Sequence, residues 1–158
     1  MYQLEVKRWL VEHRFHPREG WDVTVDVDAM ERARGGQHPE DKKALVQVAE
    51  TALTKLGAKI GAHPMFGRAD VVAEHPEKGV YLVEVEGTSS RQPEQAVYSA
   101  LGQSVLLMRG GAEKYMLAVP DDPKWERQVG KIPGFLLEQL GLQCVLVSEG
   151  GIREPVSV

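Results

Sequence analysis

Three carboxylates stand close together near the middle of the chain, in segments where acids are unusual. Asp70 opens an apolar run that continues to Ala73, and Glu84 and Glu86 end a second apolar run that begins at Val80. Because side chains alternate along a strand, Glu84 and Glu86 are expected on the same side. Buried acids need a compensating charge, which a divalent cation commonly supplies. The pattern therefore predicts a cation site on two neighbouring strands.

A polar stripe marks the helix predicted for residues 91–108, directly after these strands. Gln95, Ser99 and Gln103 are spaced by four residues and therefore share one face. The helix is apolar on nearly every other side, which predicts that it is buried and that Gln103 points toward the carboxylates. An exposed polar stripe is the alternative interpretation.

The bulk composition limits the class of protein. A chain of 158 residues suits one domain with a substantial core, and its net charge of −4 speaks against a general nucleic-acid coat without excluding a local basic groove. The single cysteine, Cys144, lies in an apolar run and predicts a core residue in a reducing compartment. We see no signal peptide and no membrane-length apolar run, so we expect a cytoplasmic protein with no membrane partner.

The order of predicted elements favours an α/β fold. We expect one domain over residues 1–158, with an N-terminal helix and strand extension over 1–39, a core over 40–147 and a loose tail over 148–158. Helices are expected over 2–14, 40–57, 91–108 and 121–140, the last broken near 132–134, and strands over 21–28, 58–62, 66–73, 80–87, 115–119 and 142–147. The core order is then α-β-β-β-α-β-α-β, with its first three strands expected to form an antiparallel meander.

Two features of the N-terminal half bear on the site. The helix over 40–57 is expected to bury a stripe of Leu45, Val48, Ala49, Ala52, Leu53 and Leu56, with Glu50 at its edge. A boundary position lets Glu50 reach either solvent or a site at the sheet. The pairs Lys7-Arg8 and Lys42-Lys43 are expected to be solvated charges.

These residues and this order resemble the PD-(D/E)xK nuclease superfamily, which has the restriction-endonuclease-like fold. Ala69-Asp70 stands where the family has Pro-Asp, Glu84 where it has its second acid, and Glu86 where it usually has lysine. Glu50 falls where many members carry a further acid on the first core helix. The run Ala100–Gln103 resembles the glutamine-bearing second helix of several subfamilies.

The resemblance implies a mixed central sheet flanked by helices, and hydrolysis of phosphodiester bonds in nucleic acid, DNA in the first place, with Mg²⁺ or Mn²⁺ as cofactor. It implies metal ligands in Asp70, Glu84, the main-chain carbonyl of Val85 and Glu50. The catalytic residues implied are Asp70, Glu84, Glu86 and Gln103, and the expected phosphate or substrate contacts are Arg68, Arg91 and Gln95.

The position of Glu86 leaves the class of activity open. A carboxylate there can accept a proton or join the metal shell, but it cannot stabilise negative charge as lysine does. Lys78, Arg68 and Arg91 are candidates for the missing positive charge, and Arg68 has the alternative of a structural ion pair with Asp70 or Glu84. The rival interpretation is a catalytically inactive nucleic-acid-binding or protein-interaction module on the same fold. A homodimer is a further expectation.

Overall fold

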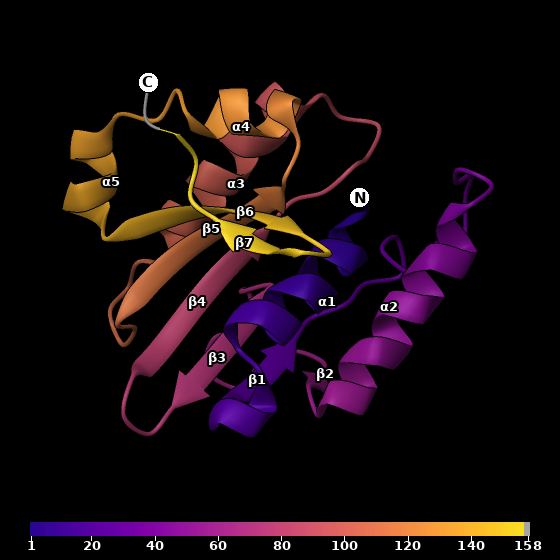
Figure 1. Cartoon of the computed structure of the whole chain (residues 1–158), viewed down its shortest axis with the longest axis horizontal. Helices are drawn as coiled ribbons and strands as arrows, with labels where there is room; N and C mark the ends of the chain where they lie inside the picture. The colour runs from indigo at the N-terminus through magenta and orange to yellow at the C-terminus, as the bar shows by residue number, and fades with distance from the viewer. Residues whose placement is uncertain (157–158) are drawn as a thin grey trace.

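A seven-stranded mixed sheet forms the centre of the computed structural model, which describes residues 1–156 (Figure 1). The strands are β1 (Asp22–Val25), β2 (Lys59–Ile60), β3 (Val71–His75), β4 (Gly79–Val85), β5 (Lys114–Pro120), β6 (Leu142–Ser148) and β7 (Gly151–Arg153). They lie in the order β2-β1-β3-β4-β5-β6-β7. The pairs β1–β2, β4–β5 and β5–β6 are parallel, and the others are antiparallel.

Helices cover both faces of the sheet. They are α1 (Gln3–Arg14), α2 (Lys42–Leu56), α3 (Pro93–Leu107), α4 (Pro123–Val129) and α5 (Gly134–Leu140), with a 3₁₀ turn at Pro17–Glu19. Figure 1 shows α1 beside α2, and α3, α4 and α5 close together in another part of the molecule. On the sheet, α1 lies over β4, β5, β6 and β7, and α3 lies over β4 and β5. The predicted α/β class, the mixed sheet flanked by helices and the break before residue 134 are confirmed, and the arrangement is consistent with a restriction-endonuclease-like core.

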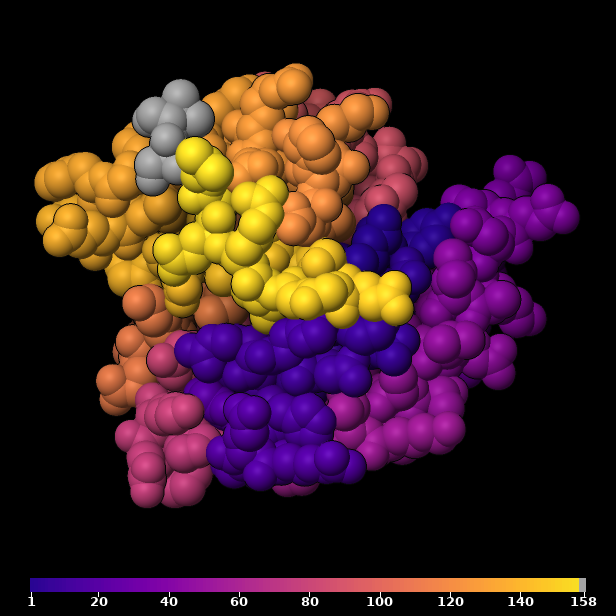
Figure 2. Space-filling model, in the orientation of Figure 1, coloured from indigo at the N-terminus to yellow at the C-terminus, as the bar shows by residue number. Residues whose placement is uncertain are grey.

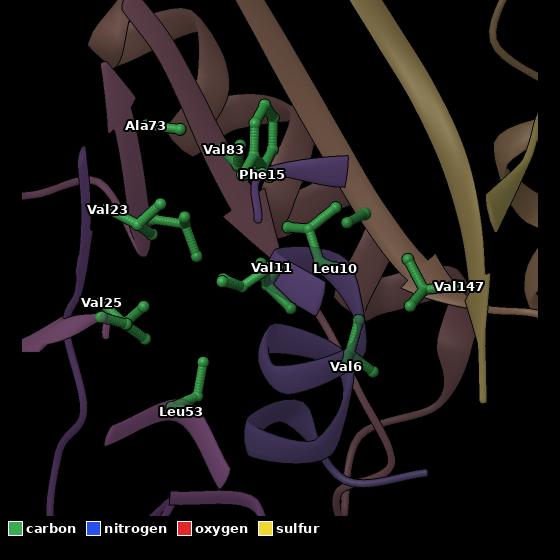
Figure 3. Packing of buried hydrophobic residues seen from close by; sticks show 14 of the residues in the cluster. Val6, Leu10, Val11, Phe15, Val23, Val25, Leu53, Ala73, Val83 and Val147 are labelled. Atoms are coloured by element: carbon green, nitrogen blue, oxygen red, sulfur yellow. The ribbon is translucent and has the colours of Figure 1, made fainter. Parts of the chain in front are cut away.

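The alternation of side chains along the strands makes two apolar layers. On one face, Val6, Leu10 and Val11 of α1 pack against side chains such as Val83 and Val147, as Figure 3 shows. On the other, Leu117, Val119 and Leu146 pack against α3 and α4. Burying each such aliphatic side chain stabilises the fold by roughly 1.5–3 kcal/mol. The position of α1 on the sheet brings its residues Gln3 and Lys7 to the end of the sheet where β4 ends.

The N-terminal strand changes the predicted connectivity of the sheet. β1 lies between β2 and β3, pairing parallel with β2 and antiparallel with β3. The predicted meander of three consecutive strands is therefore wrong at its first step, because β2 pairs only with β1. The N-terminal segment therefore contributes a strand to the interior of the sheet.

Two helices bury less of their surface than predicted. In α2, Val46, Ala49 and Leu53 are buried, but Leu45 and Val48 are 40% and 60% exposed. The reason is that α2 packs mainly against α1, so its contact is narrow. In α3, small residues such as Ala96 and Ala100 make the contact with the sheet, and Tyr98 and Leu106 are exposed.

The predicted loose tail is wrong for residues 151–153, which pair with the end of β6. Residues 151–153 form β7, and the guanidinium of Arg153 binds Asp121 and Glu126 at 2.8 Å each. Residues 157–158 of the predicted tail lie outside the described part of the chain. Within residues 1–156, none of the helices combines the length and the apolar character that crossing a membrane requires.

Candidate functional site

Asp70 lies where three strands meet at one end of the sheet. β1 and β4 end there and β3 begins there, because β3 is antiparallel to both. The Asp70 Oδ2 atom accepts a hydrogen bond from the Val85 amide at 2.9 Å, and the Asp70 carbonyl accepts one from the Asp26 amide at 2.9 Å. The neighbouring strands therefore fix this carboxylate in place.

Glu84 and Glu86 complete a buried acidic group beside Asp70. Their side chains are only 3% and 8% exposed. Burial, together with the charge of Asp70 and a hydrogen bond to it, raises the pKa of Glu84 well above its ordinary value. Burial also raises the pKa of Glu86 to about 7, although the nearby Arg91 guanidinium opposes the rise. The group is short of positive charge.

One cation approaches this acidic group from helix α1. Lys7 of α1 is fully buried, and its Nζ atom lies 2.7 Å from Glu31 Oε2, 2.6 Å from the Asp26 carbonyl and 3.7 Å from Asp70 Oδ1. The prediction that Lys7 is a solvated charge is wrong. The sequence carried a signal, because Lys7 lies three residues after Leu4 and four before Val11, on the buried stripe of α1.

Sequence reasoning also missed Glu31, the partner of Lys7. This carboxylate is 7% exposed, and burial raises its pKa to about 7 against the opposing charge of Lys7. Asp28 Oδ1 accepts a hydrogen bond from the Glu31 amide at 2.8 Å, which fixes the loop locally. Glu31 lies in a polar loop without periodicity, so no pattern in the sequence marked it.

A cavity of about 290 Å³ lies beside the acidic group, and Glu86 is the member of that group that lines it. Glu31 and Glu86 line it, with Lys42 and Arg91 among the residues of its wall. Its floor is close to the start of α1, where the side-chain Nε2 of Gln3 donates a hydrogen bond to the Val85 carbonyl at 2.8 Å. The predicted metal-ligating carbonyl thus already accepts one hydrogen bond, which leaves its second lone pair available.

Other predicted site residues lie elsewhere. Gln95 and Gln103 are exposed on α3, because small apolar residues of this helix make its contact with the sheet. Within residues 1–156, Gln103 therefore does not make the predicted contact with the carboxylates. Glu50 binds the Arg32 guanidinium at 2.6 Å instead of facing Asp70. Exposed Arg68 forms no ion pair within residues 1–156, which removes the structural pair considered for it.

Lys78 is also distant from the acidic group. It lies in the turn between β3 and β4, at the opposite end of both strands, with its Nζ 5.8 Å from the centre of the Trp21 ring. Of Lys78, Arg68 and Arg91, which sequence analysis proposed for the missing positive charge, only Arg91 lines the cavity. Lys7 of the N-terminal helix supplies another positive charge, beside Asp70.

The donor set suits a hard divalent cation in kind. Across the described chain, no three His, Cys, Asp or Glu side chains are arranged to hold a metal ion. Mg²⁺ is commonly held by one or two carboxylates and waters, and Asp70 and Glu84 are two adjoining carboxylates whose repulsion a cation would relieve. The residues present therefore fit a Mg²⁺ site in which the protein supplies few of the ligands and water supplies the others.

Comparisons with known proteins identify no relative. No family model matches the chain, and no curated protein or solved structure matches it at a significant level.

Proposed function

We propose that this protein is a metal-dependent nuclease of the PD-(D/E)xK type, which hydrolyses phosphodiester bonds in nucleic acid, DNA in the first place. The observation that supports the proposal is the meeting of Asp70, Glu84 and Glu86 at one end of the sheet with a buried lysine ammonium 3.7 Å from Asp70. Buried, charged groups whose pKa values are displaced are typical of active sites.

Asp70 and Glu84 would hold Mg²⁺ or Mn²⁺, with the Val85 carbonyl as a third ligand. The chemistry that such an ion supplies is polarisation of a phosphate oxygen and a lowered pKa for a water. The fixed position of Asp70, held by the Val85 amide, would set where that oxygen lies. Glu50, Gln95 and Gln103 are not part of the proposed site.

The other residues would manage charge and protons. Glu86 lines the cavity and has a pKa of about 7, so near neutral pH it can take a proton from an attacking water. Arg91 faces the same cavity and can neutralise a phosphate oxygen. Lys7 places a positive charge next to Asp70. This charge would partly replace that of the lysine which the family usually has at the position of Glu86.

Cleavage of labelled substrates tests the proposal. Single-stranded and double-stranded DNA and RNA are incubated with the protein and either Mg²⁺ or Mn²⁺, and products are separated by size. We expect cleavage of at least one substrate, and a loss of about two to four powers of ten in Glu86→Ala, the range of a general acid–base group. Absence of cleavage with every substrate and both metals, at high protein concentration, would refute catalysis.

Two observations favour a second candidate function, nucleic-acid binding without catalysis. The side-chain amide of Gln3 occupies one lone pair of the Val85 carbonyl, and Glu86 stands at the usual lysine position. Such a protein would bind DNA or RNA with a salt-dependent affinity and cut neither. Binding without cleavage in the assay above would select this function.

Two wider expectations are retained as proposals. A homodimer would have the exposed apolar side chains of α3, Tyr98, Val105 and Leu106, available as its contact, and light scattering of the purified protein would detect it. Cys144 is buried on β6, as a cysteine of a reducing, cytoplasmic compartment would be.

A further inference from the structure

A basic groove runs along α2 and the loop segment that carries Arg32 and Arg34. The groove has a volume of about 730 Å³, and four basic side chains line it against one acidic side chain. The basic residues are Arg32, Arg34, Lys43 and Lys55, and the acid is Glu50. Figure 2 shows α2 forming one edge of the molecule, beside the N-terminal helix.

The positive charge of this groove is largely uncompensated. Arg32 takes up Glu50 in an ion pair of 2.6 Å. Arg34, Lys43 and Lys55 are exposed and form no ion pair with the described residues. Because the whole chain has a net charge of −4, the groove is a local basic surface on an acidic protein, and it would attract an anionic chain specifically to this side.

The spacing of the groove residues suits an extended polyanion. Lys43, Gln47, Thr51 and Lys55 follow at intervals of four residues and therefore lie along one side of α2. Lys43 and Lys55 are about 18 Å apart at the helical rise per residue. Cations at both ends, with an amide and a hydroxyl between them, can contact several successive phosphates without reading bases.

The groove and the acidic cavity share a dividing wall. Glu31 turns into the cavity and binds Lys7, whereas the next residue, Arg32, turns into the groove. In α2, Lys42 lines the cavity and Lys43 lines the groove. The groove and the cavity are therefore neighbouring hollows, separated by the backbone of residues 31–32 and 42–43.

We infer that this groove binds the phosphate backbone of single-stranded nucleic acid and leads it to the acidic cavity, an inference that rests on the proposed function. A cavity of about 290 Å³ is at the small end of ligand pockets, so it receives one nucleotide at a time and not a stacked base pair. The substrate class is accordingly a single strand or a frayed end.

Fluorescence anisotropy with a labelled oligothymidylate of about 15 nucleotides tests the inference, in EDTA so that no cleavage occurs. The test variant is Arg34→Ala/Lys43→Ala. The matched control is Lys124→Ala/Arg127→Ala, which removes the same charges from exposed positions on α4. We expect the test variant to bind roughly tenfold more weakly and to lower the salt slope of log K by about 1.4, because each lost phosphate contact on a single strand removes about 0.7.

Each outcome decides the inference. Equal binding by the two double variants would overturn it, as would tighter binding of a duplex of the same sequence. Competition by polyglutamate as effective as that by unlabelled oligothymidylate would overturn the assignment to nucleic acid. Failure of the proposed function looks different, because the wild type would then bind the strand through the groove yet cut nothing with Mg²⁺ or Mn²⁺.

Discussion

The ammonium of Lys7 lies 2.7 Å from Glu31 Oε2 and 3.7 Å from Asp70 Oδ1, so that one buried cation serves two acids from separate segments. Lys7→Met should lower the free energy of unfolding by about 3–5 kcal/mol, because it leaves the Glu31 carboxylate buried without a partner. Urea denaturation near neutral pH measures this loss.

The double variant Lys7→Met/Glu31→Met separates a lost attraction from a stranded charge. Replacing a buried ion pair by apolar groups of similar volume is often nearly neutral, so we expect most of the loss to be recovered. Arg8→Met, at the neighbouring and partly exposed position, is the control and should change stability by less than about 1 kcal/mol. A double variant as unstable as Lys7→Met would show that Lys7 contributes through other contacts.

The buried glutamates Glu31, Glu84 and Glu86 should make the metal-free protein less stable as pH rises. The pKa values of Glu31 and Glu86 are raised to about 7, and that of Glu84 lies above its ordinary value, so the folded state binds more protons than the unfolded state above about pH 4.5. Since stability falls with pH wherever the folded state holds the extra protons, we expect the free energy of unfolding to decline between about pH 5 and pH 8.

Glu84→Gln identifies the origin of this slope. An amide carries no charge at any of these pH values, so the variant should be more stable than the wild type at pH 8 in EDTA and should show a flatter pH profile. Thermal denaturation at a series of pH values, without divalent cations, measures both. A variant whose profile parallels that of the wild type would mean that Glu84 does not carry the buried charge.

Metal binding should follow the ligand set proposed from the structure. Titration with Mn²⁺, followed by calorimetry, should show binding in the micromolar to millimolar range for a site open to solvent. Asp70→Asn and Glu84→Gln should abolish the binding. Glu50→Gln should leave it unchanged, because Glu50 is paired with Arg32, and so should Asp22→Asn, at the exposed start of β1. Equal losses of binding in Asp70→Asn and Asp22→Asn would show that the proposed location of the metal site is wrong.

The structure also marks which parts of this site were predictable from sequence. The two carboxylate-bearing strands follow from uninterrupted apolar runs, and alternation alone places Glu84 and Glu86 together. The insertion of β1 beside β3 depends on pairing between distant segments, which a local pattern does not encode. The pairing of Glu31 with Lys7 is not encoded in a local pattern either, since only the folded loop brings the two residues together.

Gln103 shows the opposite error, in which a pattern was given too much weight. An apolar helix with one polar stripe predicts a buried stripe, but the neighbouring α3 residues that touch the sheet are small, so the helix leaves large apolar side chains such as Leu106 exposed. Hydrophobic character alone did not distinguish a helix surrounded by protein from one with an open apolar face.

Gly87 offers a test of how tightly α1 is held over the end of β4. A Cβ atom at this position would lie 2.3 Å from the Gln3 backbone nitrogen and 2.7 Å from its Cα atom. Backbone atoms cannot rotate away as a side chain can, so Gly87→Ala must displace the first turn of α1. We expect a loss of about 1–3 kcal/mol in the free energy of unfolding, as for other overpacked sites.

Gly102→Ala is the matched control, because a Cβ atom there meets nothing within 4 Å and the residue lies inside α3. That variant should be more stable than the wild type by about 0.5–1 kcal/mol, the usual gain of alanine over glycine in a helix. Since α1 also carries Lys7, Gly87→Ala should reduce Mn²⁺ affinity or cleavage at temperatures where it remains folded, and Gly102→Ala should not. If Gly87→Ala were as stable as the wild type, the start of α1 would be free to move away from the site.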